Sequence, residues 1–404
     1  MDKSVTILGL FDTGLAVGRA LGRKGVRVYG YDYNFKNPGF KSKYIFARKC
    51  NSPIEKPEEL LDQLLKDCKG EKSRILIPTA DEFVFFINDY RELLEGSYEF
   101  ILPDKLIINS IRNKYNQTKF FENLGFKIAE SFRLSSPAEL DTISFGIEKK
   151  YVIKPINQYK WRKLFKSKAL QITDNRELNR LVNLMFEKGI EFFIQENVPG
   201  DCYNNVEISV YYNTKSIPLS TFIFRKLRQY PDEFGYGCAI QSYKNEDLYG
   251  FVIEKLTEIG WKGFANVELK YDLRENVFKF IEINPRVWQQ IGVAESLGIN
   301  FPMIMYDDLC NKDYENFFMF SKIEFKAVDP LPDLISALKR IIEKRLTFKE
   351  WFKSLDGVLY FGTYAKDDLM PFFVSLQYGI FIIKIVGYLL KHLFKNIKND
   401  TLSR

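Results

Sequence analysis

The chain of 404 residues is 46% hydrophobic and 27% charged, which is the composition of a well-cored globular protein with two or three domains. Its formal net charge of +7 comes from 59 basic and 52 acidic residues, and so small an excess argues against a nucleic-acid-binding protein. The single histidine, His392, argues against Ser-His-Asp triads and histidine-cluster metal sites. Carboxylates, lysines and arginines are therefore the groups that we expect to carry any reaction.

The five cysteines are widely spaced and form no CxxC pair, which indicates reduced thiols rather than a zinc or redox site. At the N-terminus, Asp2 and Lys3 lead directly into a strand-like run, without the small-residue cleavage site of a signal peptide. We therefore expect a cytoplasmic protein.

The first hundred residues alternate between strand-like and helical patterns. An apolar run over residues 5–10, a helical pattern over 14–24 and a second apolar run over 26–31 predict a βαβ unit. Further strand-like runs at 75–78 and 100–103 are separated by another helical stretch. This alternation favours a parallel sheet covered by helices.

A long helical pattern over residues 107–124 ends at Gly125, a typical helix stop. After this point the strands follow one another closely, which indicates antiparallel sheets in an α+β arrangement. The β-rich runs cover residues 151–154, 169–173, 192–196, 206–212, 219–224, 264–270 and 278–283. From about residue 317 the chain becomes helical and basic, and it turns strongly apolar between Leu369 and Phe394.

These changes of pattern predict three regions and a fold that is α/β in its first part and α+β in its second. The first region is a parallel-sheet domain over residues 1–110. The second is an α+β region over residues 111–310. The third is a helical C-terminal extension over residues 311–404, first basic and then apolar.

The clearest chemical signal is the run Phe280–Arg286, which reads FIEINPR. Strand alternation places Glu282 and Asn284 on one face, and Glu268 lies on a preceding strand that a hairpin would bring beside Glu282. Carboxylate and amide oxygens are ligands that Mg²⁺ takes, with waters and phosphates in the other positions. Arg286 can pair with phosphate oxygens in a bidentate manner. The alternative is that these residues form the solvent face of a hairpin.

With these residues, the sequence resembles the ATP-grasp superfamily, and in particular its carboxylate-amine ligase branch, which includes carbamoyl-phosphate-synthase-like and D-aspartate-ligase-like proteins. The resemblance covers most of residues 1–310. It implies a pre-ATP-grasp Rossmann-like domain over residues 1–110, followed by a two-lobed ATP-grasp domain over residues 111–310 that binds ATP with Mg²⁺ or Mn²⁺. The nucleotide lobe would cover residues 111–200 and the metal lobe residues 201–310, both approximately. It also implies that Glu268, Glu282 and Asn284 are the metal ligands.

The resemblance further implies a set of nucleotide contacts. In the run YVIKP, Lys154 is similar to the lysine that reaches the ATP phosphates, and Lys114 at the start of a helix is similar to a second phosphate-binding lysine. The run FIQENVPG resembles the hinge between the two halves of the ATP-binding clasp. There, Glu196 and the backbone of Val198 would recognise adenine, and Asp201 would contact the ribose.

The chain departs from the family after Lys154, because residues 157–166 lack the glycine-rich loop of many ATP-grasp proteins. Cations in this segment can cover the phosphates instead, or the segment can act as a lid. A second basic segment, residues 224–231, contains Lys226 and Arg228. It is either a basic surface loop or, together with Arg286, a group of cations that stabilises the charge of an acyl-phosphate transition state.

The resemblance implies an ATP-dependent ligase with two small-molecule substrates, a carboxylate and an amine. Mg²⁺ bridges the ATP phosphates, the carboxylate attacks the γ-phosphorus, and the amine then displaces phosphate from the acyl phosphate to form an amide. Catalysis of this kind depends on positioning and charge neutralisation, which suits a chain with a single histidine.

Two alternatives of other classes remain. The opening strand, its glycines and Asp32 about twenty residues further on are typical of a nicotinamide-dependent oxidoreductase. However, Gly9, Gly14 and Gly18 lack the GxGxxG spacing. The other alternative is a non-catalytic, membrane-associated nucleotide-binding protein, which depends on the C-terminal tail.

The uncharged residues 369–383 are fewer than the roughly 20 apolar residues of a membrane-spanning helix. Over residues 369–398, however, lysines recur on one side, which is typical of a helix lying on an anionic membrane surface. The alternative is a terminal helix that packs on the protein's own core or on the second subunit of a homodimer. Membrane contact would indicate a peripheral location on the cytoplasmic face and a role in cell-envelope or surface-polysaccharide synthesis.

Overall fold

The computed structural model describes residues 3–68, 74–146, 149–165, 167–312 and 324–376. Contacts between Cα atoms divide the chain into two compact units. The first unit comprises Met1–Pro103, Ile208–Asn266 and Asn284–Arg404, and the second comprises Asp104–Glu207 and Val267–Ile283. The domain boundaries at residues 110 and 310 stay a prediction.

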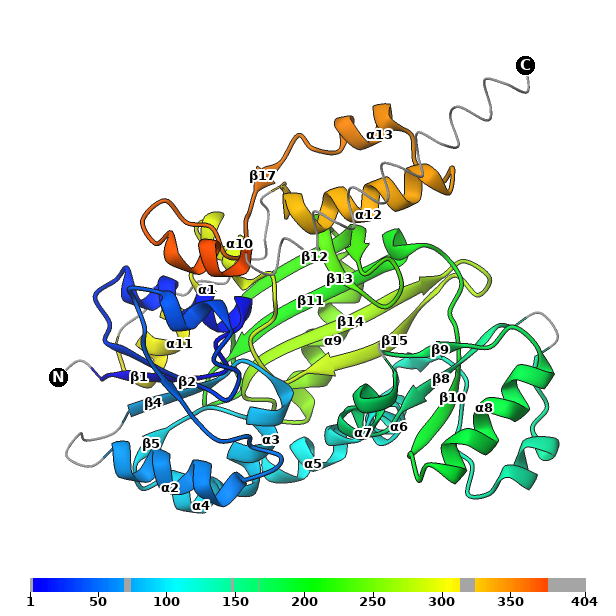
Figure 1. The fold of residues 1–404 in the computed structure, drawn as a ribbon, viewed down its shortest axis with the longest axis horizontal. Helices are drawn as coiled ribbons and strands as arrows, with labels where there is room; N and C mark the ends of the chain where they lie inside the picture. Colours follow the sequence, from blue (N-terminus) through cyan, green and yellow to red (C-terminus); the bar gives the residue numbers. More distant parts are fainter. Residues whose placement is uncertain (1–2, 69–73, 147–148, 166, 313–323, 377–404) are drawn as a thin grey trace. The chain divides into compact units, whose positions relative to one another are not determined.

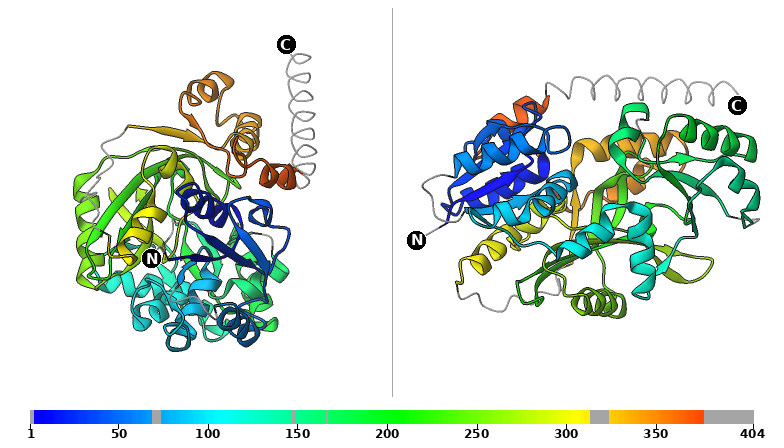
Figure 2. Two further views of the ribbon diagram at one scale, coloured as in Figure 1. Left: turned by 90° about the vertical axis from the view of Figure 1, so that its left-hand side faces the viewer. Right: turned by 90° about the horizontal axis from the view of Figure 1, so that it is seen from below.

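The N-terminal part of the first unit is a five-stranded parallel sheet with the order β3-β2-β1-β4-β5. Its strands are β1 (Val5–Leu8), β2 (Val28–Asp32), β3 (Phe46–Lys49), β4 (Arg74–Pro78) and β5 (Tyr98–Glu99). Helix α1 (Asp12–Gly22) lies on one face, and α2 (Pro57–Asp67) and α4 (Arg91–Leu94) lie on the other (Figure 1), as right-handed crossovers on the two sides of β1 require. All residues of β1 and β4 are buried, which confirms the predicted parallel domain, drawn in blue in Figure 2.

Strand β3 and the end of β5 differ from the sequence prediction. β3 is an edge strand in which only Ala47 is partly buried, so it has no apolar run that a pattern could detect. Residues 100–103, predicted as a strand, lie beyond the end of β5 at Glu99. Their apolar character comes from burial of Ile101 and Leu102 in a connecting segment.

The glycines and the aspartate that suggested a dinucleotide site serve the local fold. Gly9 has a φ of +95°, and a Cβ atom on Gly14 would lie 1.9 Å from the backbone oxygen of Gly9, so α1 and the β1 turn meet by backbone contact. The carboxylate of Asp32 accepts hydrogen bonds from two backbone N–H groups and from Asn37 Nδ2. These local bonds occupy the side chain that a nicotinamide ribose would need, so the oxidoreductase alternative is not favoured.

The larger sheet has eight strands in the order β17-β16-β13-β12-β11-β14-β15-β6. The division between the units falls within β11, β14 and β15. The strands are β6 (Lys127–Ile128), β11 (Asn205–Tyr212), β12 (Pro218–Tyr230), β13 (Tyr236–Ser242), β14 (Gly263–Asp272), β15 (Val277–Asn284), β16 (Lys326–Val328) and β17 (Val358–Leu359). The basic segment at residues 224–231 is therefore mostly strand, because β12 continues to Tyr230, and the surface-loop interpretation is wrong.

Aromatic side chains form much of the core of the first unit. The indole of Trp288 lies between Phe264 and Phe301, with ring centroids 6.2 and 4.7 Å away, and Phe222 stacks on Phe325. The other helices of this unit are α3 (Asp81–Asp89), α9 (Glu246–Glu258), α10 (Ile291–Ser296), α11 (Phe301–Leu309), α12 (Pro330–Ile342) and α13 (Phe348–Lys353). This core holds the segment that follows β15 against the sheet.

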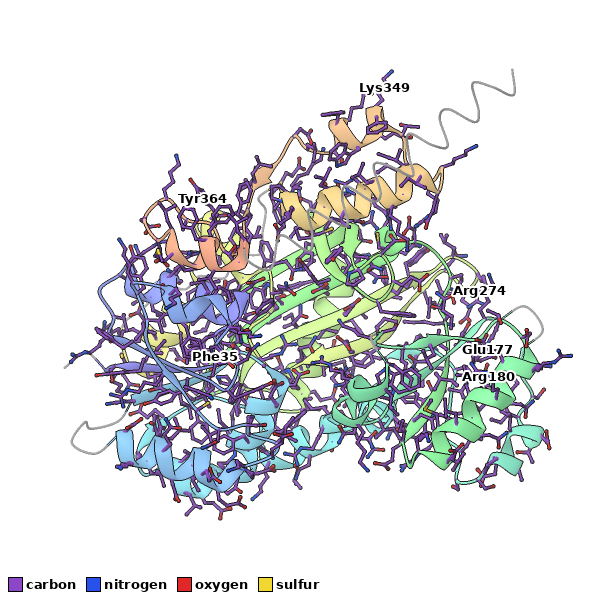
Figure 3. The ribbon with its side chains drawn as sticks, viewed as in Figure 1. Phe35, Glu177, Arg180, Arg274, Lys349 and Tyr364 are labelled. Atoms are coloured by element: carbon purple, nitrogen blue, oxygen red, sulfur yellow. The ribbon has the colours of Figure 1, made fainter. Side chains whose placement is uncertain are left out.

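The second unit contains a four-stranded antiparallel sheet of order β7-β10-β8-β9. Its strands are β7 (Ser131–Phe132), β8 (Tyr151–Pro155), β9 (Leu170–Gln171) and β10 (Phe192–Glu196). Helices α7 (Gln158–Leu164) and α8 (Asn175–Glu187) follow β8 and β9 along the chain. α8 buries Leu178, Leu181 and Met185 at helical spacing. Arg180 lies on the opposite, exposed side of α8 (Figure 3).

The helix predicted over residues 107–124 is two helices, α5 (Lys105–Arg112) and α6 (Lys114–Asn123). Asn113 separates them because its side chain accepts hydrogen bonds from the N–H groups of Tyr115 and Asn116 and so caps α6. Phe121 of α6 stacks on Phe280 of β15, with ring centroids 4.2 Å apart. This contact holds the C-terminal turn of α6 against β15.

No helix within the described ranges is long and apolar enough to cross a membrane. Most of the membrane-surface helix predicted over residues 369–398 lies outside the described residues, which end at Leu376 in this region. All five cysteines are free thiols.

Candidate active site

The first group of predicted site residues lies around Lys154 in the second unit. Lys154 is in β8, where its neighbours Val152 and Ile153 are buried in the sheet. Its Nζ atom donates a hydrogen bond to Oε1 of Gln195 on β10 at 2.6 Å, because the antiparallel register places the two side chains on the same face. A neutral partner therefore holds the ammonium group in a defined place.

Burial and neighbouring charges set the pKa of Lys154. Burial lowers this pKa to about 8, two nearby carboxylates oppose the shift, and two nearby lysines reinforce it. The carboxylates are those of Glu282 and Glu268, and the lysines are Lys114 and Lys270. The structure therefore brings together four of the predicted residues: both lysines and both glutamates.

Lys114 reaches this cluster because α6 is attached to β15. Gln117 donates from Nε2 to the backbone oxygen of Ile283 at 3.0 Å, and its Oε1 accepts from the N–H of the same residue at 3.2 Å. From the first position of α6, Lys114 Nζ donates to Glu282 Oε2 at 2.9 Å. The two hydrogen bonds of the Gln117 amide attach the start of α6 to β15, and this attachment places Lys114 Nζ next to the Glu282 carboxylate.

The surroundings of Glu282 are strongly positive. Burial alone would raise the pKa of Glu282, but three lysine side chains hold that pKa below its usual value. These lysines are Lys114, Lys168 and Lys154. With Lys270, four ammonium groups accompany the two carboxylates of the cluster. The excess of positive charge suits a ligand that carries several negative charges.

Glu268 has a neighbour that bears on metal binding. Its carboxylate accepts a hydrogen bond from Asn205 Nδ2 at 3.1 Å, and Asn205 Oδ1 is buried with no hydrogen-bond partner among the described residues. A buried amide oxygen without a partner, beside a carboxylate, is a donor of the kind that Mg²⁺ takes. The residues of this cluster therefore fit a magnesium ion.

Asn284 and Arg286 belong to the first unit, where they form a group of their own. Asn284 is buried, donates from Nδ2 to Asn266 Oδ1 at 3.3 Å, and accepts from Arg286 Nη2 at 3.4 Å. Arg286 also donates from Nε to Asp81 Oδ1 at 2.7 Å. Asp81, at the start of α3, thus orients the guanidinium group, a role that the sequence analysis missed.

The predicted hinge residue Glu196 has its carboxylate inside an ion-pair network of the second unit. It accepts from Arg274, which lies in the turn between β14 and β15 (Figure 3), and from Lys279 Nζ at 3.3 Å. Burial would raise the pKa of Glu196, but the hydrogen bond from Arg274 holds it below its usual value. The carboxylate is therefore engaged by the protein's own cations.

The same network contains three carboxylates close enough to share a metal ion. Glu196, Asp272 and Glu275 offer oxygens within 4.8 Å of one another. Lys279 Nζ, however, lies 3.3, 3.0 and 2.7 Å from these three carboxylates. Because Lys279 and Arg274 already neutralise the group, we interpret it as an ion-pair network that stabilises the β14–β15 turn, not as a metal site.

The other two predicted hinge residues, Val198 and Asp201, lie outside this ion-pair network and differ in burial. Val198 is 4% exposed and lies in the segment that follows β10. Asp201 is exposed, and its Oδ1 accepts a hydrogen bond from the N–H of Cys202 at 2.6 Å. Asp201 therefore caps the short turn before β11.

Lys226 and Arg228, predicted as phosphate-binding cations, are buried in the first unit at 1% and 3% exposure. Arg228 donates from Nε to Asp333 on α12 and from Nη1 to Ser354 Oγ at 2.8 Å. Asp333 also accepts from Trp351 Nε1 at 2.9 Å. This network joins β12 to α12 and α13, so the guanidinium of Arg228 serves the fold. Lys226 Nζ donates to the backbone oxygen of Gly235 at 3.3 Å.

Several residues of the cluster around Lys154 escaped the sequence analysis. Lys270 follows Glu268 by two positions on one strand, and alternation could have placed both on one face. Lys168 stands just after the basic segment 157–166. Asn205 and Gln195 carry no local signal, because their roles depend on pairing between distant strands.

No protein-family model matches the chain. It is 23% identical to the D-aspartate ligase of Enterococcus faecium over 291 residues, a match that spans 67% of this chain and 65% of that ligase. Its structure resembles that of an L-amino acid ligase from Bacillus licheniformis, with a TM-score of 0.58 and 17% identity over 76% of this chain and 74% of that one. It also resembles the ADP complex of an N5-carboxyaminoimidazole ribonucleotide synthetase, with a TM-score of 0.63 and 12% identity over 85% of both chains.

The chain therefore has the ATP-grasp fold that its sequence predicted. The relative that is similar in sequence is a D-aspartate ligase, and one of the structures that share the fold is an L-amino acid ligase.

Proposed function

We propose that this protein is an ATP-dependent carboxylate-amine ligase that forms an amide through an acyl-phosphate intermediate. The observation that carries the proposal is the cluster of four lysines and two glutamates in the second unit of an ATP-grasp fold. Such a cluster suits a nucleoside triphosphate with a divalent cation, because the lysines can bind the phosphates and the glutamates can bind the metal ion.

The phosphates are assigned to Lys114 and Lys154. The hydrogen-bond partner of Lys154 is the neutral amide of Gln195, so the ammonium group can also donate to a phosphate oxygen without breaking an ion pair. Lys114 is paired with Glu282, and binding of a metal by that carboxylate would release the ammonium group toward phosphate. The backbone near Val198 is assigned to adenine and Asp201 to ribose, while Glu196 positions the hinge through its pairs with Arg274 and Lys279.

The metal is assigned to Glu268, Glu282 and Asn284, with the buried oxygen of Asn205 as a further candidate. When bound, Mg²⁺ or Mn²⁺ would neutralise charge on the transferred phosphoryl group. Arg286, oriented by Asp81, would stabilise the same developing charge from the protein side. Lys226 and Arg228 are left out of this assignment because both side chains are buried and bonded within the fold.

The proposed reaction has two steps. An oxygen of the substrate carboxylate forms a bond to the γ-phosphorus of ATP as the bond to ADP breaks. The amine nitrogen then bonds to the acyl carbon, phosphate leaves, and the nitrogen loses its extra proton to give the amide. Positioning and fixed charges perform most of this catalysis.

Purified protein with ATP and Mg²⁺ tests the proposal through ADP and phosphate release. We expect release to require one carboxylate and one amine from a set of amino acids, sugar acids and their nucleotide-linked forms. Glu282→Ala should lower the rate at least about 100-fold, whereas Glu254→Ala, an exposed glutamate of α9, should leave it unchanged. Release at the wild-type rate in Glu282→Ala, or no ATP-dependent release with any pair, would contradict the proposal.

We further propose that the C-terminal residues bring the enzyme to an anionic membrane surface, a location that would suit an enzyme of cell-envelope or surface-polysaccharide synthesis. Leu369, Met370 and Phe373 precede the tail and are 42%, 56% and 53% exposed, and the residues beyond 376 combine apolar side chains with spaced lysines.

Flotation with vesicles tests this second proposal. We expect the full chain to bind vesicles that contain anionic lipid, with binding that weakens as salt rises, and a chain ending at Leu376 to remain unbound. Equal binding of both forms, or none, would contradict it. A change from dimer to monomer on truncation, without vesicle binding, would instead identify the tail as a homodimer contact.

A further inference from the structure

The net positive charge of the chain comes from one segment of the parallel-sheet domain, residues 23–54. This segment holds eight of the 59 basic residues but one of the 52 acidic residues, so the other residues of the chain carry 51 of each. Its single acidic side chain, that of Asp32, is buried. The segment includes β2, the short helix Pro38–Lys41 and β3. The excess charge is therefore concentrated on one part of the domain.

Five of these cations lie on β3 or on the segments beside it, and they form no ion pair among the residues that the structure describes. All five are exposed, namely Arg27, Lys36, Lys41, Lys43 and Lys49. By contrast, Arg23 pairs with Asp367 and Glu295, and Arg48 pairs with Asp67. The edge of the sheet at β3 thus presents positive charge that the described carboxylates do not neutralise.

Two exposed aromatic rings accompany these cations. Phe46 of β3 is 59% exposed, and Phe35, labelled in Figure 3, is 61% exposed. Arg27 Cζ lies 5.6 Å from the ring centroid of Phe46, and Lys49 Nζ lies 5.7 Å from that of Phe35. Because Phe46 and Lys49 point to opposite faces of the sheet, each face carries an aromatic ring and a cation beside the edge. Charge alone protects an edge strand from aggregation, so the exposed rings indicate a contact surface.

The backbone of β3 is open on its outer side. β3 pairs only with β2 in the sheet, and in a parallel ladder alternate residues direct their N–H and C=O groups to the neighbouring strand. Cys50 N–H donates to the backbone oxygen of Asp32 at 3.0 Å, so the groups of Ala47 and Lys49 point away from β2. The oxygen of Lys49 accepts from Gln63 Nε2 at 3.0 Å. The N–H and C=O of Ala47 and the N–H of Lys49 can therefore pair with an added strand.

We propose that the edge of β3 binds an acidic segment of a partner protein as an additional strand. An extended polypeptide supplies the alternating N–H and C=O groups that match Ala47 and Lys49. Its carboxylates meet the exposed cations, and its apolar side chains meet Phe46 and Phe35. Phosphates of lipids or nucleic acids match the cations but supply no such backbone groups. A second copy of this chain would bring two basic edges together, which repel each other.

Fluorescence anisotropy of a labelled synthetic peptide with the full chain tests the proposal. A peptide of repeated Glu-Glu-Val-Val presents glutamate and valine in turn on each face of an extended strand. We expect saturable binding that weakens as salt rises. The same peptide with every valine nitrogen methylated keeps its charge but loses pairing donors on both edges, and it should bind at least about 10-fold more weakly. A peptide with lysine in place of glutamate should not bind.

Two variants locate the binding on β3. Ala47→Pro removes an outward N–H without touching the bonds between β3 and β2, as proline at a sheet edge allows. Arg27→Gln/Lys49→Gln removes the two cations beside the aromatic rings and leaves the backbone unchanged. We expect each variant to weaken peptide binding at least about 10-fold, whereas Lys215→Gln, in the exposed turn between β11 and β12, should bind as the wild type does. Thermal unfolding shows whether the variants fold.

Several results would overturn the proposal. They are no saturable binding of the acidic peptide, equal binding of its methylated form, and unchanged affinity in the folded Arg27→Gln/Lys49→Gln variant. Tighter binding of single-stranded DNA than of the peptide would assign the surface to nucleic acid, and loss of vesicle binding in the double variant would assign it to lipid. A dimer in sedimentation that Ala47→Pro dissociates would assign the edge to a second copy of the chain.

Discussion

Replacement of Lys154 by methionine should lower kcat/KM for ATP by about 100- to 1,000-fold, the cost expected for a preorganised charged donor in an active site. The Nζ atom of Lys154 is held at 2.6 Å from Gln195 and lies among the charges of Glu282 and Glu268. Methionine is unbranched and close in volume to lysine, so it removes the charge with little change in packing.

The stability of the Lys154→Met variant distinguishes a functional lysine from a structural one. Burial disfavours the charged form of Lys154, so its removal should leave the urea midpoint unchanged or raise it. Lys119→Met on the exposed side of α6, where the lysine pairs with Glu122, is the matched control and should retain full activity. ATP turnover at the wild-type level in a folded Lys154→Met protein would refute the assignment of this lysine to phosphate.

Replacement of Arg228 by methionine should lower the free energy of unfolding by about 3–5 kcal/mol, because it leaves the buried carboxylate of Asp333 without its cation. The side chains of Arg228 and Asp333 are 4% and 1% exposed. The exposed pair of Lys326 and Asp356 provides the comparison, and Lys326→Met should cost no more than about 1 kcal/mol. Urea denaturation followed by circular dichroism measures both values.

A double variant separates the structural role of Arg228 from the phosphate-binding role that the sequence suggested. In Arg228→Met/Asp333→Asn no buried charge is left unpaired, and the asparagine can still accept from Trp351 Nε1. We expect this variant to recover much of the lost stability and to keep its ATP turnover in the cold. Recovery of stability with loss of turnover would show instead that Arg228 acts in catalysis.

The sequence by itself determined the fold class and much of the second-unit cluster. Strand alternation is a local property, so Glu282 could be identified from the sequence pattern, and a hairpin between neighbouring strands was expected to bring Glu268 beside it. Lys114 and Lys154 were implied by the resemblance to a known family, which also needs no tertiary structure. The parallel pairing of β1 with β2 and β4 also follows from the alternation of apolar runs and helices, whereas the order of the strands came only from the structure. For the same reason, β3 was missed, because an exposed edge strand lacks an apolar run.

Only the tertiary structure decided which charged side chains are available to bind a ligand and which are engaged by other residues of the protein. Arg228 appears on a basic segment, but Asp333, more than a hundred positions later, takes up its charge. Glu196 similarly acquires Arg274 and Lys279 from a distant hairpin. Burial and ion pairing arise from long-range contacts, and a pattern of neighbouring residues carries no information about such contacts.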